Sequence, residues 1–482
     1  MIIVLMLGFL FQFITVSATT VGNLTIPSVL ADHMLLPRNR PIHLWGRAAS
    51  GTSVQVTMKQ GATSIRSGSS VTAANGDWLI SLTSLPGSFT EYTIVISAGP
   101  DVIMLEHVLV GEVWVAGGQS NMGLQVQYAT DRVETMLTAN NPKLRIFTQD
   151  VPPSSTFNFS YTPLFDVLNG AWKPANSGSN IAECSAVAYS FGVKLFEILN
   201  TAGQEMPVGI INVATGGTSL HAWLSREKIE NADPLLKNKN YIAQADWNTG
   251  SVSGKFNQMT AQYNAKVAPL GKFGANGIIW YQGENNVGNG AGPYMRLGIK
   301  ALAEDWSSTF GSTSGRLPFI FSQLTPKYYG KTSGYESTAL PGILEGFVDA
   351  YSDLKAVQDN AAVIPVYDVE LIWKDSGNSF RYQSPSHPTT KKPIGERMAI
   401  AARNVAFSHS GTFVPPTYSA ISINGNKAIV TFDNAGDGLK ILRNEPKLRG
   451  FTICGSDLKY IEADATIVNG NQVEVSSPLI TQ

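Results

Sequence analysis

The stretch "VWVAGGQSNMGLQVQ", Val113–Gln127, runs from apolar residues through two glycines to the polar residues Gln119, Ser120 and Asn121. An apolar run without polar alternation is typical of a strand that is buried on both faces, as in a parallel sheet covered by helices. Ser120 at the end of such a strand has two interpretations. Its hydroxyl caps the following helix, or it is exposed at the strand-to-helix turn as a nucleophile, with the backbone N–H groups of the helix beside it.

The chain beyond this stretch continues with alternating strand and helix patterns. Apolar runs without polar alternation are "LRIF", "PVGIINVA", "GIIWYQG" and "PFIFSQL". Between and after them, apolar residues recur at helical spacing from Val187 to Leu199 and again from Ile394 to Val405. This alternation predicts an α/β domain over residues 111–410, built on a parallel sheet with flanking helices.

Two β-rich regions flank the predicted α/β domain. Residues 21–110 contain the runs "IHLWG", "SVQVTM", "WLISL" and "YTIVISA", separated by turn residues, which predict an N-terminal β-sandwich. Residues 411–482 contain "AIVTF", "GFTIC" and "QVEVSS" and predict a C-terminal β module. A chain of 482 residues exceeds the roughly 250 to 300 residues at which a single core stops growing, so several domains are expected.

Composition and charge narrow the classes of function. The chain is 43% hydrophobic and 15% charged, as in ordinary globular proteins. Its formal net charge of -1 gives no electrostatic reason to expect nucleic acid or an anionic membrane surface as a partner. With 2 cysteines and 6 histidines, the sequence shows neither a disulfide framework nor the spacing of metal ligands. We therefore expect no metal site, and no part of the sequence suggests an organic cofactor.

The N-terminal segment predicts entry into the secretory pathway. Residues 1–18 contain an uncharged apolar run followed by small residues, which is typical of a signal peptide cleaved near Ala18. The run is shorter than the ~20 residues that a membrane span needs, so no span is expected after the signal is removed. Asn23 and Asn158 begin glycosylation sequons. The predicted location is secreted or lysosomal, hence extracytoplasmic.

Polar, glycine-containing turns follow several of the predicted strands. Ser120, the Gly216–Thr218 turn, the Gln282–Asn286 turn and the segment around His387 each fall at a strand end or in a loop beyond the sheet. Ligands of open α/β sheets bind outside the carboxyl ends of the strands. We therefore expect these turns to converge on one edge of the sheet, where a serine, a histidine and backbone N–H donors meet the needs of ester hydrolysis.

The motifs "GGQSNM", "GGTSLHAW", "WYQGENN" and "SPSHPTTKKPIGERMA", in this order, resemble the sialate O-acetylesterase family, a branch of the SGNH/GDSL-type hydrolases. The resemblance implies an SGNH-type α/β fold with Ser120 as nucleophile and His387 as general base. It also implies an oxyanion hole. The expected donors are the backbone N–H groups of Ser120 and Gly217 and a side-chain amide, with Gln282 as first choice and Asn285 or Asn286 as alternatives.

The group that orients His387 departs from the usual pattern. Many SGNH enzymes have an aspartate three residues before the histidine, where this chain has Ser384. A main-chain carbonyl near Pro385 is one alternative, and the carboxylates Asp368, Asp375 and Glu284 are the others. His221, in "GGTSLHAW", is the nearest rival to His387 as the base.

The expected function is a secreted serine esterase that removes O-acetyl groups from sugars through an acetyl-serine intermediate. O-acetylated sialic acid is the first expected substrate, and acetylated xylan or another polysaccharide is the alternative. A non-catalytic carbohydrate-binding protein is the alternative from another functional class. A lipase or serine peptidase is less favoured, because this sequence has no Gly-x-Ser-x-Gly motif. Trp223, Trp280 and Tyr281 flank the expected site and either stack on a sugar or belong to the core. The sequence predicts no oligomeric state.

Overall fold

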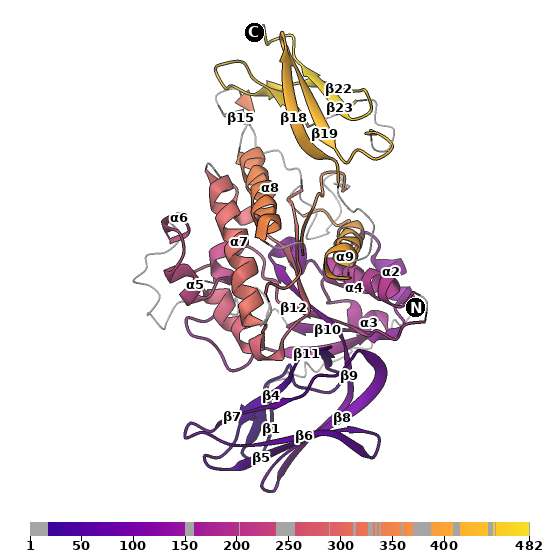
Figure 1. Ribbon diagram of the computed structural model, residues 1–482, viewed down its shortest axis with the longest axis vertical. Helices are drawn as coiled ribbons and strands as arrows, with labels where there is room; N and C mark the ends of the chain where they lie inside the picture. The colour runs from indigo at the N-terminus through magenta and orange to yellow at the C-terminus, as the bar shows by residue number, and fades with distance from the viewer. Residues whose placement is uncertain are drawn as a thin grey trace, which may run out of the picture.

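The computed structural model describes residues 18–149, 159–201, 203–237, 256–288, 290–311, 315–325, 331–332, 335–336, 339–357, 360–369, 387–407, 415–441, 447–448 and 450–481. Three parts follow one another along the longest axis of the molecule (Figure 1). An N-terminal β part lies at one end, an α/β part with a mixed sheet lies in the middle, and a C-terminal β part lies at the other end. The predicted α/β fold with flanking β modules is confirmed.

The N-terminal part is made of two sheets. One sheet has the strand order β1 (Thr19–Val21), β2 (Leu24–Ile26), β4 (Ile42–Arg47) and β7 (Asp77–Leu82). The other contains β3 (Leu35–Pro37), β5 (Ser53–Gln60), β6 (Thr63–Val71), β8 (Ser88–Ala98) and the first half of β9 (Asp101–Gly118). Val54, Val56 and Met58 of β5 are buried while the residues between them are more exposed, as the two-residue period of a half-buried strand requires.

Strand β9 belongs to both the N-terminal and the central part. Its first half pairs antiparallel with β8, and its second half pairs parallel with two strands of the central sheet. Every residue from Val108 to Gly118 is buried. The predicted boundary between residues 110 and 111 thus falls inside a continuous buried strand, which pairs in the sheets of both parts and ends just before the candidate nucleophile.

The central sheet carries seven strands in the described residues, in the order β11-β10-β12-β9-β13-β14-β17. The strand β11 is antiparallel to its neighbour β10, and the other pairs are parallel. The bounds are β10 (Asn141–Gln149), β11 (Gly170–Ala175), β12 (Val208–Asn212), β13 (Gly277–Tyr281), β14 (Phe319–Ser322) and β17 (Ala361–Ile364). The apolar runs of the sequence form β9, β10, β12, β13 and β14, as predicted.

Helices cover both faces of this sheet. Figure 1 shows α7 (Ala291–Thr309) and α8 (Ala339–Val357) on one side, and α4 (Ala186–Leu199) and α9 (Lys392–Phe407) on the other. The short helices are α1 (Ser120–Gly123), α2 (Arg132–Thr138), α3 (Gly178–Ile181), α5 (Arg226–Glu230) and α6 (Pro234–Lys237). Single turns of other helical types include η2 (Leu220–Trp223), η4 (Tyr263–Val267) and η6 (Glu284–Asn286).

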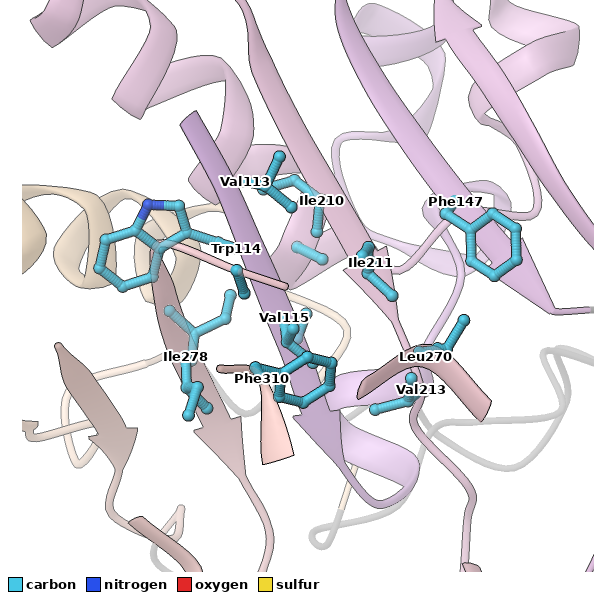
Figure 2. Close-up of a cluster of buried hydrophobic side chains, with 14 of the residues drawn as sticks. Val113, Trp114, Val115, Phe147, Ile210, Ile211, Val213, Leu270, Ile278 and Phe310 are labelled. Carbon is cyan, nitrogen blue, oxygen red and sulfur yellow. The ribbon is translucent and has the colours of Figure 1, made fainter. Parts of the chain in front are cut away.

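The core of the central part is formed by side chains of adjacent strands. Figure 2 shows Val113, Trp114 and Val115 of β9 beside Ile210 and Ile211 of β12, with the other labelled side chains around them. Each of these five residues is fully buried. A strand buried on both faces needs apolar residues at successive positions, and this is why the stretch around Ser120 begins with a run that does not alternate.

The C-terminal part has a smaller core. Its main sheet has the order β18-β19-β23-β22, and two further strands pair separately. The bounds are β18 (Thr417–Asn424), β19 (Lys427–Asp433), β20 (Thr452–Ile453), β21 (Ile461–Glu462), β22 (Asp464–Val468) and β23 (Gln472–Ser476). A short hairpin of β15 (Lys331–Thr332) and β16 (Tyr335–Glu336) precedes α8.

The end of β9 requires a glycine at position 118. Gly118 has φ 145°, and a Cβ atom there would lie 2.0 Å from the carbonyl oxygen of Tyr281. We expect Gly118→Ala to lower the free energy of unfolding by about 2–4 kcal/mol, because it adds both backbone strain and a clash with backbone. Urea denaturation measures this change. Gly123→Ala is the matched control, because its Cβ would meet only the Ala214 side chain at 3.6 Å; an equal loss in both variants would contradict the prediction.

Candidate active site

Ser120 lies at the turn between β9 and α1. Gln119 occupies the N-cap position of α1 and Ser120 is its first residue, with no side-chain capping bond at this end. The Ser120 Oγ lies 2.7 Å from Nε2 of His387 and 3.5 Å from Nε2 of Gln119. The helix-cap interpretation of Ser120 is therefore wrong. The helix that follows is a single turn, Ser120–Gly123, and the Ser185 hydroxyl donates to its Met122 carbonyl at 2.5 Å.

His387 reaches Ser120 from a loop 267 positions later in the chain. It is half-buried and lies just before α9. The same loop is tethered at Thr389, whose carbonyl accepts a hydrogen bond from the Thr130 N–H at 3.0 Å. A distance of 2.7 Å between Oγ and Nε2 allows direct proton transfer from the hydroxyl to the imidazole.

The turn after β12 packs against Ser120. The Thr215 N–H donates to the Gly118 carbonyl at 3.0 Å, and a Cβ atom on Gly216 would lie 3.4 Å from the Ser120 Cβ. Gly217 has φ 74°, a conformation that glycine adopts without strain. Within the described residues, the backbone N–H groups of Ser120 and Gly217 have no hydrogen-bond acceptor, so both are available to a bound oxyanion.

The expected amide Gln282 is engaged with protein groups. It is fully buried, and its Nε2 lies 2.6 Å from Asn286 Oδ1, 3.0 Å from the Thr218 carbonyl and 3.3 Å from Gln119 Oε1. The alternatives are engaged as well, since Asn285 donates to the Ser219 hydroxyl at 2.7 Å and Asn286 accepts from the Leu220 N–H at 3.1 Å. These amides connect the turn after β13 to the turn after β12.

The carboxylates considered as partners of His387 lie in different places. Both oxygens of Asp368 accept hydrogen bonds from the guanidinium of Arg397 on α9. Glu284 accepts a hydrogen bond from the side-chain amide of Asn121, the residue after the candidate nucleophile. Glu284 therefore lies at the site, whereas Asp368 forms an ion pair with Arg397. Asp375, Ser384 and Pro385 lie outside the described residues.

His221 is held in a buried neutral form. Its Nε2 lies 3.1 Å from the Asn257 carbonyl, which only accepts, so Nε2 carries the proton and Nδ1 accepts from the Tyr294 hydroxyl at 2.9 Å. Burial lowers the pKa of His221 to about 4. The imidazole thus binds two protein groups, and this is a structural arrangement.

The aromatic residues near the site belong to the core. Trp223, Trp280 and Tyr281 have no exposed surface. The Trp280 ring packs edge-on against Trp223 and Trp306, at centroid distances of 5.9 and 5.4 Å. The interpretation that these three side chains stack on a sugar is wrong, because a fully buried ring presents no face to a ligand.

Three residues of the site had no assigned role from the sequence. Gln119 Oε1 accepts from the N–H groups of Gly283 at 3.3 Å and Asn285 at 3.2 Å, so it links the nucleophile turn to the turn after β13. Asn121 and Lys391 are joined by a hydrogen bond of 2.5 Å between Lys391 Nζ and Asn121 Oδ1. The sequence offers no signal for Lys391, since it stands next to the exposed Lys392 in "TKKP" and nothing in the pattern separates a buried lysine from an exposed one.

The remaining predictions concern metals, membranes and glycosylation. Within the described residues, no group of three or more His, Cys, Asp or Glu side chains is placed to hold a metal ion. In the same part of the chain, no helix combines the length and the apolar character needed to cross a membrane. Asn23 is exposed, while the predicted signal peptide, apart from Ala18, and Asn158 lie outside the described residues.

A cavity of about 660 Å³ is lined by residues of α7, α8 and the C-terminal part, and its wall does not include Ser120, Gln282 or His387. It begins at Gly288, shortly after the Gln282–Asn286 turn, and is walled by the first turns of α7 and α8. The C-terminal part contributes Thr452 and Tyr460 to its lining. The charged side chains in the wall are Arg296, Glu345 and Asp349.

Comparison with known proteins finds similar carbohydrate esterases. Residues 110–341 match the family model for the carbohydrate esterase, sialic acid-specific acetylesterase domain, which includes Ser120, Gly217 and Gln282 but ends before His387. The sialate O-acetylesterase of Mus musculus is 25% identical over 425 residues, covering 81% of this chain and 75% of the relative. That of Homo sapiens is 26% identical over 403 residues, covering 80% and 72%.

A solved structure is similar over almost the whole chain. It is a carbohydrate acetylesterase from Xanthomonas citri that is 27% identical to this chain, with a TM-score of 0.73. The superposition covers 95% of this chain and 92% of the other. The four motifs, the fold and these relatives agree on one class of protein. The chain carries a domain that matches the sialic acid-specific acetylesterase family, is similar to sialate O-acetylesterases over most of its length, and is a carboxylic ester hydrolase.

Proposed function

We propose that the protein removes O-acetyl groups from sugars, with O-acetylated sialic acid as the first substrate, through an acetyl-serine intermediate. The observation that carries this proposal is the distance of 2.7 Å between Ser120 Oγ and His387 Nε2, with Ser120 at the turn between β9 and α1, inside the matched domain. A serine next to a half-buried imidazole is the minimum that acyl transfer requires.

The reaction proceeds in two balanced steps. In the first, Ser120 Oγ attacks the acetyl carbon while its proton passes to His387 Nε2, and the tetrahedral intermediate collapses by breaking the bond to the sugar oxygen, which receives that proton. In the second, water gives a proton to His387 and attacks the acetyl-serine, and the ester bond to Ser120 breaks as the proton returns to Oγ. The products are acetate and the free sugar hydroxyl.

The backbone supplies the proposed oxyanion hole. The N–H groups of Ser120 and Gly217 lie in adjacent turns and are available to developing negative charge. Gln282 remains the proposed side-chain donor by resemblance, although both of its amide hydrogens face protein acceptors here. Its use as a donor therefore requires one of these internal hydrogen bonds to be exchanged for the substrate oxygen.

The proposed cellular location is the secretory route. Residues 1–18 have the pattern of a signal peptide, and Asn23 is exposed as an acceptor for glycosylation must be. Both observations support a secreted or lysosomal enzyme. Signal cleavage near Ala18 would leave Asn23 close to the mature N-terminus.

Acetylated xylan or another polysaccharide is a second candidate substrate. The cavity between α7, α8 and the C-terminal part has a volume within the roughly 300–1,000 Å³ of ligand pockets, and its lining begins at Gly288, which follows the Gln282–Asn286 turn in the chain. Its wall offers a guanidinium, carboxylates and the Tyr460 side chain, which suit a polyhydroxylated ligand. A longer carbohydrate could therefore extend from the site toward the C-terminal part.

Acetate release from a panel of esters tests the proposal. We expect the purified protein to release acetate from O-acetylated sialic acid at a higher kcat/KM than from acetylated xylan, and also to hydrolyse an aryl acetate. The Ser120→Ala variant is the control for contaminating esterases. Faster acetate release from acetylated xylan would select the second candidate. Binding of sugars without acetate release from any ester would identify a non-catalytic carbohydrate-binding protein.

A further inference from the structure

A buried lysine contacts the residue that follows the candidate nucleophile. The side chain of Lys391 has no exposed surface, and its Nζ donates a hydrogen bond of 2.5 Å to Oδ1 of Asn121. Asn121, which is also fully buried, donates through its Nδ2 to Glu284. A buried ammonium is costly unless it is hydrogen-bonded and compensated by opposite charge. In this site Asn121 provides the hydrogen bond, and Glu284 provides the compensating charge.

The Lys391–Asn121 hydrogen bond connects the same two segments of chain as the Ser120–His387 hydrogen bond. Ser120 and Asn121 are consecutive on the nucleophile turn, and His387 and Lys391 lie four residues apart on the loop that leads into α9. Two hydrogen bonds therefore connect the same two segments of chain. Asn121 also donates a hydrogen bond to Glu284 on η6, so the turn after β13 is bonded to the nucleophile turn as well.

We propose that Lys391 is a positioning residue, which fixes the loop of His387 against the turn of Ser120 and anchors both to the Glu284 turn. The inference rests on the proposed roles of Ser120 and His387. A shift of about 1 Å between a nucleophile and its base can cost about 10²-fold in rate, so a second connection between their segments has a direct kinetic consequence.

The charge of Lys391 depends on pH in the physiological range. Burial lowers the pKa of Lys391 to about 7, while the nearby Glu284 carboxylate acts in the opposite direction. Lys391 therefore carries its charge below about pH 7 and becomes a neutral amine above it. The titratable groups that the described residues bring near it are Glu284, Tyr281 at the end of β13, whose ring centroid lies 5.4 Å from Nζ, and His387 on its own loop. The pKa of Tyr281 is raised well above its ordinary value by burial, so this phenol stays neutral.

The charged form of Lys391 is the form that holds the segments together. Loss of its proton weakens the hydrogen bond to Asn121 and leaves the Glu284 carboxylate without its compensating charge. The wild-type kcat should therefore fall as the pH rises through about 7, with Lys391 as the origin of that change. Glu284→Gln removes the charge that raises the pKa of Lys391, so it should move this midpoint to lower pH.

Three lysine variants test the proposal on an aryl acetate, whose small size makes the rate independent of sugar binding. Lys391→Met removes the ammonium at similar length, and Lys391→Gln keeps a donor for Asn121 without the charge. Lys392→Met is the matched control, because the adjacent lysine is exposed. We expect kcat to fall about 10- to 100-fold in Lys391→Met, with KM within threefold, a smaller fall in Lys391→Gln, and wild-type values in Lys392→Met.

Two further readouts separate positioning from structure. The change in kcat near pH 7 should disappear in both Lys391 variants, and the rate at which a fluorophosphonate probe labels Ser120 should fall in parallel with kcat. Thermal unfolding and the fraction of folded protein are measured alongside. Wild-type kcat and an unchanged pH profile in both Lys391 variants, or a loss explained entirely by unfolded protein, would overturn the inference. A wild-type protein inactive on every ester and unreactive toward the probe would instead overturn the proposed function.

Discussion

Ser120→Ala should lower kcat/KM for an aryl acetate by about 10³- to 10⁶-fold while leaving the thermal unfolding midpoint nearly unchanged. The variant removes the only protein atom of the proposed mechanism that forms a covalent bond to the acetyl group, and the oxyanion donors alone supply a small residual rate. The Ser120 Oγ contacts His387 and lies at the limit of hydrogen bonding to Gln119, so its loss breaks few stabilising interactions. Steady-state kinetics and differential scanning calorimetry measure the two effects.

Two further measurements make the Ser120 prediction specific. If the acetyl-serine hydrolyses more slowly than it forms, wild-type protein should release a burst of phenol whose amount equals that of the enzyme. The variant should show no burst. Ser352→Ala is the matched control, because this serine is exposed on α8 and donates to the Val348 carbonyl of its own helix, at 3.0 Å. Hydrolysis by Ser120→Ala at more than a tenth of the wild-type rate would exclude Ser120 as the nucleophile.

The strands of the central sheet were predictable because a strand that is buried on both faces has apolar residues at successive positions. The runs that form β9, β10, β12, β13 and β14 contain successive apolar residues, which a half-exposed strand would not tolerate. The length of β9 was not predictable in the same way. A local pattern identifies a strand but does not show that one strand passes through two sheets, since this depends on pairing with β8 on one side and β12 on the other.

The meeting of Ser120 and the Gly216–Gly217 turn also followed from the fold, because parallel strands bring their carboxyl ends to one edge. The roles of the amides did not follow. Whether Gln282 faces a substrate or a protein acceptor depends on the rotamer that its neighbours allow, and Thr218 and Asn286 are neighbours only in the folded chain. In the same way, Trp280 is adjacent to the site in sequence but points into the core.

His387→Ala should lower kcat/KM for the same aryl acetate by about 10³- to 10⁵-fold, and its effect should not add to that of Ser120→Ala. The imidazole takes the proton from Oγ over 2.7 Å, so either deletion removes the same activated nucleophile. The double variant should therefore be no slower than the slower of the two single variants. His43→Ala is the matched control, because His43 lies in the N-terminal part and contacts Ser81 at 2.8 Å.

The alternatives to this prediction have distinct signatures. If the two effects multiplied, Ser120 and His387 would act independently, and the hydrogen bond between them would have no part in the mechanism. If His387→Ala kept most of its activity and His221→Ala lost it, the base would be His221, contrary to its burial and its bonds to Tyr294 and Asn257. A low residual rate in His387→Ala that rises with added imidazole would support proton transfer at the position of the missing ring, because the small base can occupy the space next to Ser120.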